Sequence, residues 1–245
     1  MDDQSKKVRK GVPSKVLRYF PIAPRLKTMY KYDLEHYNFI LVFPFLYYLY
    51  HLSQCYYMII YYINDKNIFH YSSVDMSQKM RWHHENASND GQMRHPVDSP
   101  TWKTIDDKWP SFSSEPHNVR LEMAVDGFNP FGDLRNTYSV WLVVLVTYNL
   151  PPWLCTKMNF CMLTLLILGP KQPGNDIDVY LEPLVNELKE LWDQGVWTHD
   201  SYGKTCFNMK EILMWVIRDF AAYGNMDGCT KKGYNACAIC GRNTE

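Results

Sequence analysis

Two aspartates, Asp126 and Asp219, each stand at the end of a segment with strand character, residues 119–126 and 209–220. If the two strands are neighbours, the carboxylates lie close together at one edge of a sheet. Carboxylate oxygens are ligands of hard divalent cations such as Mg²⁺. Two such metals ~3.5–4 Å apart activate water or a 3′-hydroxyl and stabilise the leaving oxygen in phosphodiester transfer. The alternative is two unrelated surface carboxylates, because acidic residues end many strands.

The chain between these aspartates predicts the elements that position them. Residues 140–148 and 160–168 are continuous apolar runs, each stopped by a turn that contains proline, which is typical of strands buried on both faces. Residues 178–194 carry apolar side chains at helical spacing and are followed by Gly195, a helix terminator. The predicted order is therefore strand, strand, strand, helix, strand.

Composition excludes several classes of protein. The chain has 245 residues, of which 46% are hydrophobic and 21% charged, enough for one large domain or one and a half. These values exclude a disordered or collagen-like chain. The net charge of zero argues against a uniformly basic nucleic-acid coat protein. A metal site brings its own positive charge, so a protein with an acidic core can still act on DNA.

Composition also divides the chain into four zones: a basic segment at 1–37, an apolar, tyrosine-rich insertion at 38–72, a polar linker region at 73–117, and a folded α/β segment at 118–245. The insertion has no charged residue from 38 to 64, long enough to cross a bilayer, which takes ~20 residues. Tyrosine prefers the membrane interface to the hydrocarbon, however, and the residue types are those of A/T-rich codons. We therefore favour a translated intron over a membrane helix.

The cysteines indicate a reducing compartment. There are seven, without regular spacing, and no signal peptide precedes them. Cys237 and Cys240 alone stand at metal-ligand spacing and are half of a zinc site that needs two more ligands. The alternative is a pair of free thiols near the C-terminus.

Several longer motifs follow one another along the chain: Gln78–Glu85, Arg94–Lys103, Glu115–Leu121, Asp126–Gly132, Tyr148–Trp153, Gly169–Leu181, Leu188–Trp192, Asp219–Gly224 and Cys237–Cys240. Together they resemble the plant En/Spm-type (CACTA) transposase family, and the resemblance covers roughly residues 12–31 and 74–245. It implies a ribonuclease H-like core with a DDE/D metal triad that cuts DNA at transposon ends, uses Mg²⁺ or Mn²⁺, works in the nucleus and can assemble with other transposase chains. Asp126 looks like the first carboxylate of the triad and Asp219 the second.

The chain also departs from the family pattern. The third acidic residue of the family lies beyond the cysteine pair, and Glu245 is too close to Cys240 to serve. Ala221 and Ala238 stand where the family usually has proline. We therefore expect a ribonuclease H-like mixed sheet that is incomplete at the C-terminus and has an irregular N-terminal region. As a fragment without its third carboxylate, it is expected to be inactive.

Other groupings favour structural roles. The cluster that contains His83, His84, Glu85 and His95 lacks the helical His pair of a zinc protease, so we expect structural or DNA-facing roles for it. Asp176 and Asp178 fit a helix N-cap and first turn. The basic residues from Lys6 to Lys31 could contact phosphates, act as a nuclear signal or form a solvated tail. A non-catalytic DNA- or protein-binding remnant and a membrane-anchored protein are the competing functions.

Overall fold

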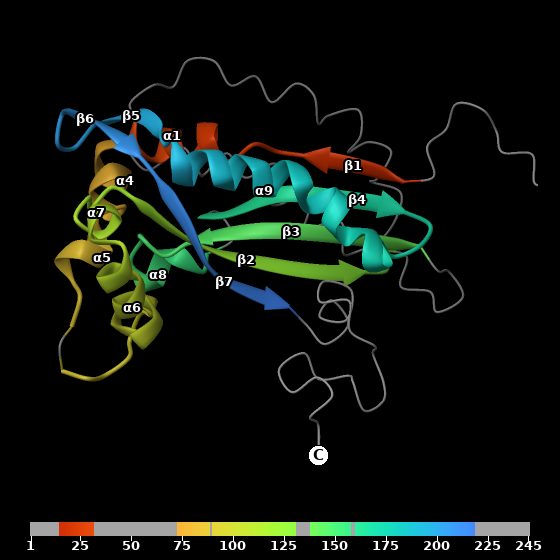
Figure 1. The fold of residues 1–245 in the computed structure, drawn as a ribbon, viewed down its shortest axis with the longest axis horizontal. Helices are drawn as coiled ribbons and strands as arrows, with labels where there is room; N and C mark the ends of the chain where they lie inside the picture. The colour runs from red at the N-terminus through yellow and green to blue at the C-terminus, as the bar shows by residue number, and fades with distance from the viewer. Residues whose placement is uncertain (1–14, 32–72, 89, 131–137, 158–159, 219–245) are drawn as a thin grey trace, which may run out of the picture.

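The computed structural model describes residues 15–31, 73–88, 90–130, 138–157 and 160–218. These residues form an α/β fold around a five-stranded mixed sheet with the order β1-β4-β3-β2-β7, beside a two-stranded hairpin, β5-β6 (Figure 1). The strands are β1 (Val16–Tyr19), β2 (Val119–Phe128), β3 (Ser139–Thr147), β4 (Cys161–Gly169), β5 (Val196–Asp200), β6 (Thr205–Met209) and β7 (Glu211–Arg218). The α-helices are α1 (Ala23–Tyr30), α4 (Ser73–Lys79), α5 (Trp82–Glu85), α6 (Pro100–Lys108), α7 (Pro110–Ser113), α8 (Pro152–Cys155) and α9 (Ile177–Asp193). Two 3₁₀ turns, η2 (Pro96–Asp98) and η4 (Gly174–Asp176), complete the described elements.

The sheet is antiparallel except at one pair of strands. β2, β3 and β4 form an antiparallel meander, and β1 pairs antiparallel with β4. After β4 the chain passes through α9 and returns as β7, which lies parallel to β2. This arrangement contains the predicted order of three strands, a helix and a strand, with the hairpin β5-β6 inserted between α9 and β7.

The N-terminal region is more regular than expected. Pro24 occupies the first turn of α1, where a missing N–H costs nothing, so it begins the helix instead of breaking one. Ile22, Leu26 and Tyr30 are fully buried in the same core cluster as the central strands. The Arg25 guanidinium donates to the backbone carbonyls of Phe20, Pro21 and Leu163. This side chain therefore serves the fold instead of a solvated tail.

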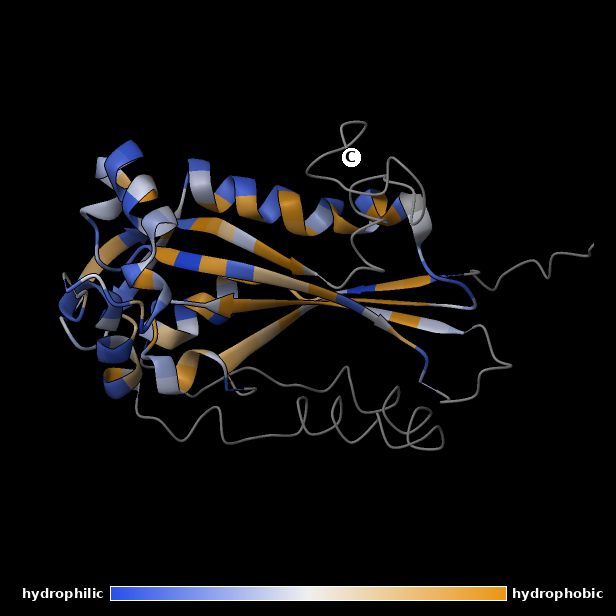
Figure 2. Cartoon of the chain, turned by 90° about the horizontal axis from the view of Figure 1, so that it is seen from below, coloured by the Kyte–Doolittle hydropathy of each residue, from blue (hydrophilic) through white to orange (hydrophobic). Residues whose placement is uncertain are grey.

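Helix α9 covers one face of the sheet and contacts β1, β4 and β7. Figure 2 shows its hydrophobic side turned towards the strands. Gly195 follows the helix with φ +70°, a conformation that glycine adopts without steric cost, which confirms the predicted terminator. The buried side chains of α9 are Ile177, Leu181, Leu184, Leu188 and Leu191.

Glu187 of α9 fastens the N-terminal elements to this helix. Its carboxylate accepts hydrogen bonds from the backbone N–H groups of Ile22 and Ala23, and in each the nitrogen lies 2.9 Å from the nearest carboxylate oxygen. It also accepts a hydrogen bond from the Tyr19 hydroxyl. Burial and the neighbouring Glu187 charge raise the pKa of Tyr19, so the phenol stays protonated. The connection between β1 and α1 is thus held at three points.

The two faces of β2 differ in chemistry. Val119, Leu121, Met123 and Val125 belong to the core cluster that includes the buried residues of α9. Since successive strand residues alternate between faces, the residues between and after them point to the opposite side. That opposite face carries Arg120, Glu122, Ala124 and Asp126 in order along the strand.

Helices α4 to α8 gather at the end of the sheet where β2 begins, whereas β2 and β7 end on the other side (Figure 1). Cys155, Cys161 and Cys206 are free thiols. Among the described residues, no helix is both long and apolar enough to span a bilayer. The tyrosine-rich insertion at 38–72 lies outside the described residues.

Candidate functional site

Asp126 lies near the C-terminal end of β2, opposite Leu142 of β3. Its side chain is exposed, and its Oδ1 accepts a hydrogen bond from the Gly127 N–H at 2.7 Å. The buried part of β2 ends at Val125, and Asp126 is the first exposed residue of the strand. An exposed carboxylate at a strand end offers the hard oxygen that Mg²⁺ and Mn²⁺ prefer.

The packing of Trp141 on the neighbouring strand requires a glycine at position 127. It pairs with Trp141 of β3, and a Cβ added at Gly127 would come within 2.3 Å of the Trp141 Cε2. The Trp141 side chain is buried, so it cannot easily move aside. The glycine after Asp126 is therefore a packing requirement that fixes the backbone beside the carboxylate.

The second predicted carboxylate, Asp219, lies outside the described residues. The residue directly before it, Arg218, ends β7 and pairs with Val125, the residue directly before Asp126. The two strands run in the same direction. The first and last strands of the predicted core, β2 and β7, are thus neighbours in the sheet.

Glu122 is an acidic side chain on the same face of β2 as Asp126. It is buried and accepts a hydrogen bond from the Tyr148 hydroxyl, and burial raises the pKa of the Glu122 carboxyl. Four residues along a strand separate it from Asp126 by about 13 Å, too far for a shared metal. Glu122 therefore belongs to a packed group with Tyr148 and Trp215, whose rings are 5.6 Å apart.

The histidines of the sequence cluster have packing roles. His83 is buried beside Arg120, and burial first, then the Arg120 charge, lower the pKa of His83 well below its usual range. The His95 Nδ1 accepts a hydrogen bond from the Val97 N–H at 3.2 Å, and its ring lies 4.9 Å from that of Trp82. Within the part of the chain that the structure describes, no group of three or more His, Cys, Asp or Glu side chains could hold a metal.

Two further predicted positions differ in outcome. Asp176 occupies the N-cap of α9 as expected, but its side chain makes no capping hydrogen bond. Asp178 lies in the first turn, where a negative charge favours the helix dipole. The possible zinc ligands Cys237 and Cys240 lie outside the described residues.

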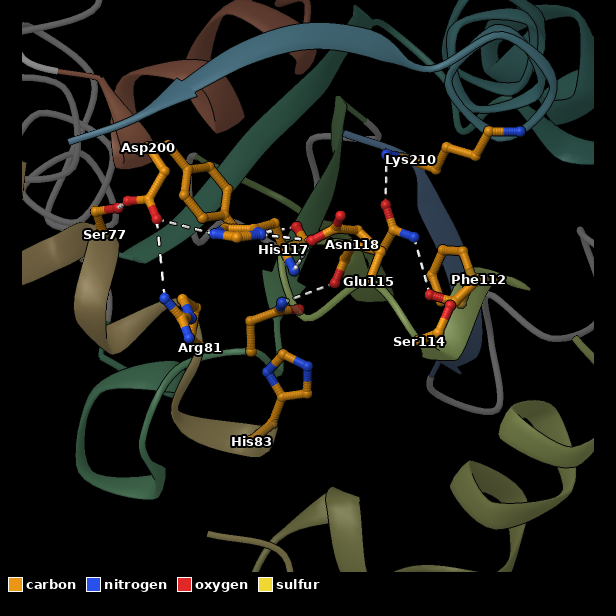
Figure 3. Close-up of polar contacts among 12 residues, drawn as sticks. Ser77, Arg81, His83, Phe112, Ser114, Glu115, His117, Asn118, Asp200 and Lys210 are labelled. Carbon is orange, nitrogen blue, oxygen red and sulfur yellow. Dashed lines mark hydrogen bonds and ion pairs between the residues drawn. The ribbon is translucent and has the colours of Figure 1, made fainter. Parts of the chain in front are cut away.

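A buried polar network that the sequence did not indicate surrounds Asp200 (Figure 3). Asp200 is fully buried and accepts hydrogen bonds from the Ser77 hydroxyl, the His117 imidazole at 2.9 Å and the Tyr202 N–H at 2.9 Å. Burial alone would raise the pKa of Asp200, but the hydrogen bonds from Ser77 and His117 outweigh it and lower the pKa. The network joins α4, the start of β2 and the hairpin β5-β6.

The geometry of this network indicates a structural role and not a catalytic one. The Ser77 hydroxyl donates to Asp200 instead of to the His117 imidazole, so it lacks the order of a nucleophilic triad. Next to it, the Asn118 amide donates to the Phe112 carbonyl and accepts from the Lys210 N–H, as Figure 3 shows. The polar motif that precedes β2 therefore anchors the helices to the sheet.

One comparison with known protein families found a match. Residues 90–245 match the model of the family described as Transposase family tnp2. The match covers more than half of the chain, so the protein belongs to this transposase family, and the resemblance to En/Spm-type transposases is confirmed. A search among curated proteins found no match.

Proposed function

We propose that this chain supplies part of the catalytic core of a metal-dependent DNA transposase. In this proposal Asp126 and Asp219 bind a divalent cation, Mg²⁺ or Mn²⁺, and the substrate is DNA at transposon ends in the nucleus. The family membership supports a function in transposition. The observation that carries the site is the parallel pairing of Val125 with Arg218, each of which directly precedes one of the two aspartates.

The topology supports a ribonuclease H-like fold. Such a core needs an antiparallel meander of three strands, a helix across the sheet and a fourth strand parallel to the first. β2, β3, β4, α9 and β7 meet these requirements in that order. β1 adds a strand to the far side of the meander, beside β4.

Chain geometry limits the distance between the two aspartates. Paired Cα atoms of neighbouring strands are about 4.8 Å apart, and consecutive Cα atoms 3.8 Å. Since Val125 and Arg218 are paired, we expect the Cα atoms of Asp126 and Asp219 to lie within about 12 Å of each other. Two carboxylates within that limit can reach one cation or a pair of cations.

The proposed roles follow from the chemistry of the residues. Bound metal would polarise a phosphodiester and lower the pKa of an attacking hydroxyl or water. Asp126 and Asp219 would hold the metal, and Gly127 would keep the Asp126 backbone against Trp141. The third carboxylate implied by the family would lie beyond Cys240, and Cys237 and Cys240 would be half of a zinc site. We therefore infer that residues 1–245 do not cut DNA on their own.

A cleavage assay tests this proposal. Terminal-repeat DNA is incubated with Mg²⁺ or Mn²⁺ and either residues 1–245 or a longer chain that contains the downstream acidic residue. We expect no cleavage above background from residues 1–245 and metal-dependent cleavage from the longer chain. Asp126→Ala or Asp219→Ala should each abolish the activity of the longer chain, because either change removes a metal ligand.

Asp176→Ala is the matched control, since Asp176 is also an exposed carboxylate but lies at the N-cap of α9. The control should retain activity. Robust metal-dependent cleavage by residues 1–245 would overturn the expected need for a downstream carboxylate. A longer chain that binds DNA without cutting it would instead favour a non-catalytic remnant.

A further inference from the structure

A pocket of about 240 Å³ lies between α5, α6 and the start of β2. Its lining includes the buried Arg120 and, from exposed positions, His84 of α5 and Lys103 of α6. Ser88 and Ser113 add hydroxyl groups. The lining is therefore rich in hydrogen-bond donors.

Arg120 forms the most constrained part of this lining. Its guanidinium lies between the rings of Trp102 and Phe112, 4.5 and 5.0 Å from their centroids. One terminal nitrogen donates to Asp106 at 2.7 Å, and the other lies 3.2 Å from the His83 Nε2. The Arg120 Nε is buried and has no hydrogen-bond partner. The two rings and Asp106 therefore hold the guanidinium in place on the wall of the pocket.

The charges of the pocket favour an anion. Arg120 and Lys103 carry two positive charges, and Asp106 is the one carboxylate of the lining. Asp106 is already paired with Arg120. His83 is neutral at pH 7 and can accept the Arg120 hydrogen bond, since its pKa is strongly lowered. Arg120, Lys103 and Asp106 together therefore give the lining an excess of one positive charge.

We propose that this pocket binds a phosphate group, with the backbone of DNA as its source during transposition. The part of this inference that names DNA as the source of the phosphate rests on the proposed function. Arg120 and Asp126 lie on the same face of β2, six residues or about 20 Å apart. With a rise of 3.4 Å per base pair along the axis, this distance corresponds to about six base pairs of duplex. Because the strands wind around the axis, DNA that presents its scissile phosphate to Asp126 would bring another phosphate of its backbone, from either strand, to the pocket.

The test compares two lysines of the same helix. Lys103 lines the pocket, whereas Lys108 lies over the ring of Trp109, 4.5 Å from its centroid. Binding of residues 1–245 to a fluorescent duplex is measured by anisotropy across a range of salt concentrations. Lys103→Gln should weaken binding several-fold and reduce the slope of log K against log salt by about 1, because one phosphate contact is lost. Lys108→Gln should change the affinity and the slope less.

Asp106→Asn should change the affinity in the opposite direction to Lys103→Gln. Removing this negative charge should strengthen binding, which a partly unfolded protein could not imitate. The second probe is inorganic phosphate, whose ³¹P line width is followed at constant ionic strength with the same three variants. Phosphate binding that Lys103→Gln weakens and Asp106→Asn strengthens is the expected result.

The two probes separate this inference from the proposed function. If the chain binds phosphate in this pattern but not DNA, the pocket is supported with free phosphate as its source, and the DNA-binding function fails. If the chain binds DNA but Lys103→Gln and Lys108→Gln behave alike and phosphate does not bind, the pocket proposal is overturned and the function stands. Binding of neither probe overturns the pocket proposal as well.

Discussion

Val125 and Arg218 pair across the parallel strands β2 and β7, and each directly precedes an aspartate in the chain. Parallel pairing matters because both strands then end on the same side of the sheet. α9 makes the parallel return possible, since it carries the chain across the sheet between β4 and β7. The proposed metal site depends on this connection more than on any single side-chain contact.

Glu187→Gln is expected to loosen the N-terminal elements. The Glu187 carboxylate accepts from two backbone N–H groups and from Tyr19, and the neutral amide would replace charge-assisted bonds with weaker ones. The free energy of unfolding should fall by about 1.5–3 kcal/mol. Urea unfolding measures this loss, with Glu190→Gln on an exposed position of the same helix as control. Equal stability of the two variants would contradict the role of Glu187.

Gly127→Ala should strain the strand beside Asp126. The added methyl group would overlap the Trp141 ring, and overpacking of this kind costs about 1–3 kcal/mol. Trp141→Phe removes the ring atoms nearest to Gly127, so the double variant should lose less stability than the two single changes predict together. Thermal or urea unfolding of the four proteins gives this coupling. Strict additivity would show that Gly127 and Trp141 do not constrain each other.

Glu211→Gln is expected to stabilise the protein at neutral pH. Glu211 is buried, its Oε2 has no hydrogen-bond partner, and burial, followed by the charge of Glu187, raises its pKa well above the usual range. In the unfolded chain this carboxyl titrates near ~4.3, so native stability falls as the pH rises from there towards the raised pKa. The amide removes this loss. The gain should be absent near pH 4 and reach about 1–3 kcal/mol at neutral pH.

Urea unfolding between pH 4 and 8 measures the effect of Glu211→Gln. Glu190→Gln again serves as the exposed control. A stability difference for Glu211→Gln that stays constant over this range would contradict the raised pKa.

Asp200→Asn should show the opposite dependence on pH. The pKa of Asp200 is lowered in the folded protein, so its ionised form contributes stability above the unfolded value of ~3.9 and loses it as the pH falls through the folded value. At pH 7 the variant should lose about 3 kcal/mol, because it weakens the bonds from Ser77 and His117. The difference should shrink below pH 4. Urea unfolding from pH 3 to 7 tests this, and a loss that grows on acidification would contradict it.

The main elements of the sheet could be predicted because their apolar runs are long. The expected strands at 119–126, 140–148 and 160–168 differ from β2, β3 and β4 by one or two residues at most ends. The expected helix at 178–194 corresponds to α9. In each segment, burial on one or both faces of the sheet dictates the hydrophobic pattern.

The prediction of the last strand was less accurate than that of the first three. The predicted segment 209–220 contains the last residue of β6 and the whole of β7, which are separated only by Lys210. The hairpin escaped prediction because β5 exposes one face, including Trp197, and mixes polar with apolar residues. In the turn between β5 and β6, the positive φ of 53° falls on Lys204 and not on the glycine before it, Gly203.

The candidate carboxylates Asp126 and Asp219 stay a prediction from the sequence, and the buried polar contacts elsewhere in the fold could not be predicted. An acidic residue after an apolar run is visible in the sequence, as at Asp126. The network of Ser77, His117 and Asp200 joins residues that are 83 and 123 positions apart, and no local pattern reports such contacts. The same holds for Arg120, which resembles a polar position of an alternating strand but lies buried between two rings.

Binding of Mn²⁺ to residues 1–245, followed by loss of the EPR signal of the free ion, tests the shared metal site most directly. We predict weak but measurable binding that Asp126→Asn and Asp219→Asn each abolish, because both carboxylates are ligands of the same site. Asp176→Asn should bind Mn²⁺ as the unaltered chain does. If either Asp126→Asn or Asp219→Asn bound Mn²⁺ as well as the unaltered chain, or if the unaltered chain bound none, the shared site would be contradicted.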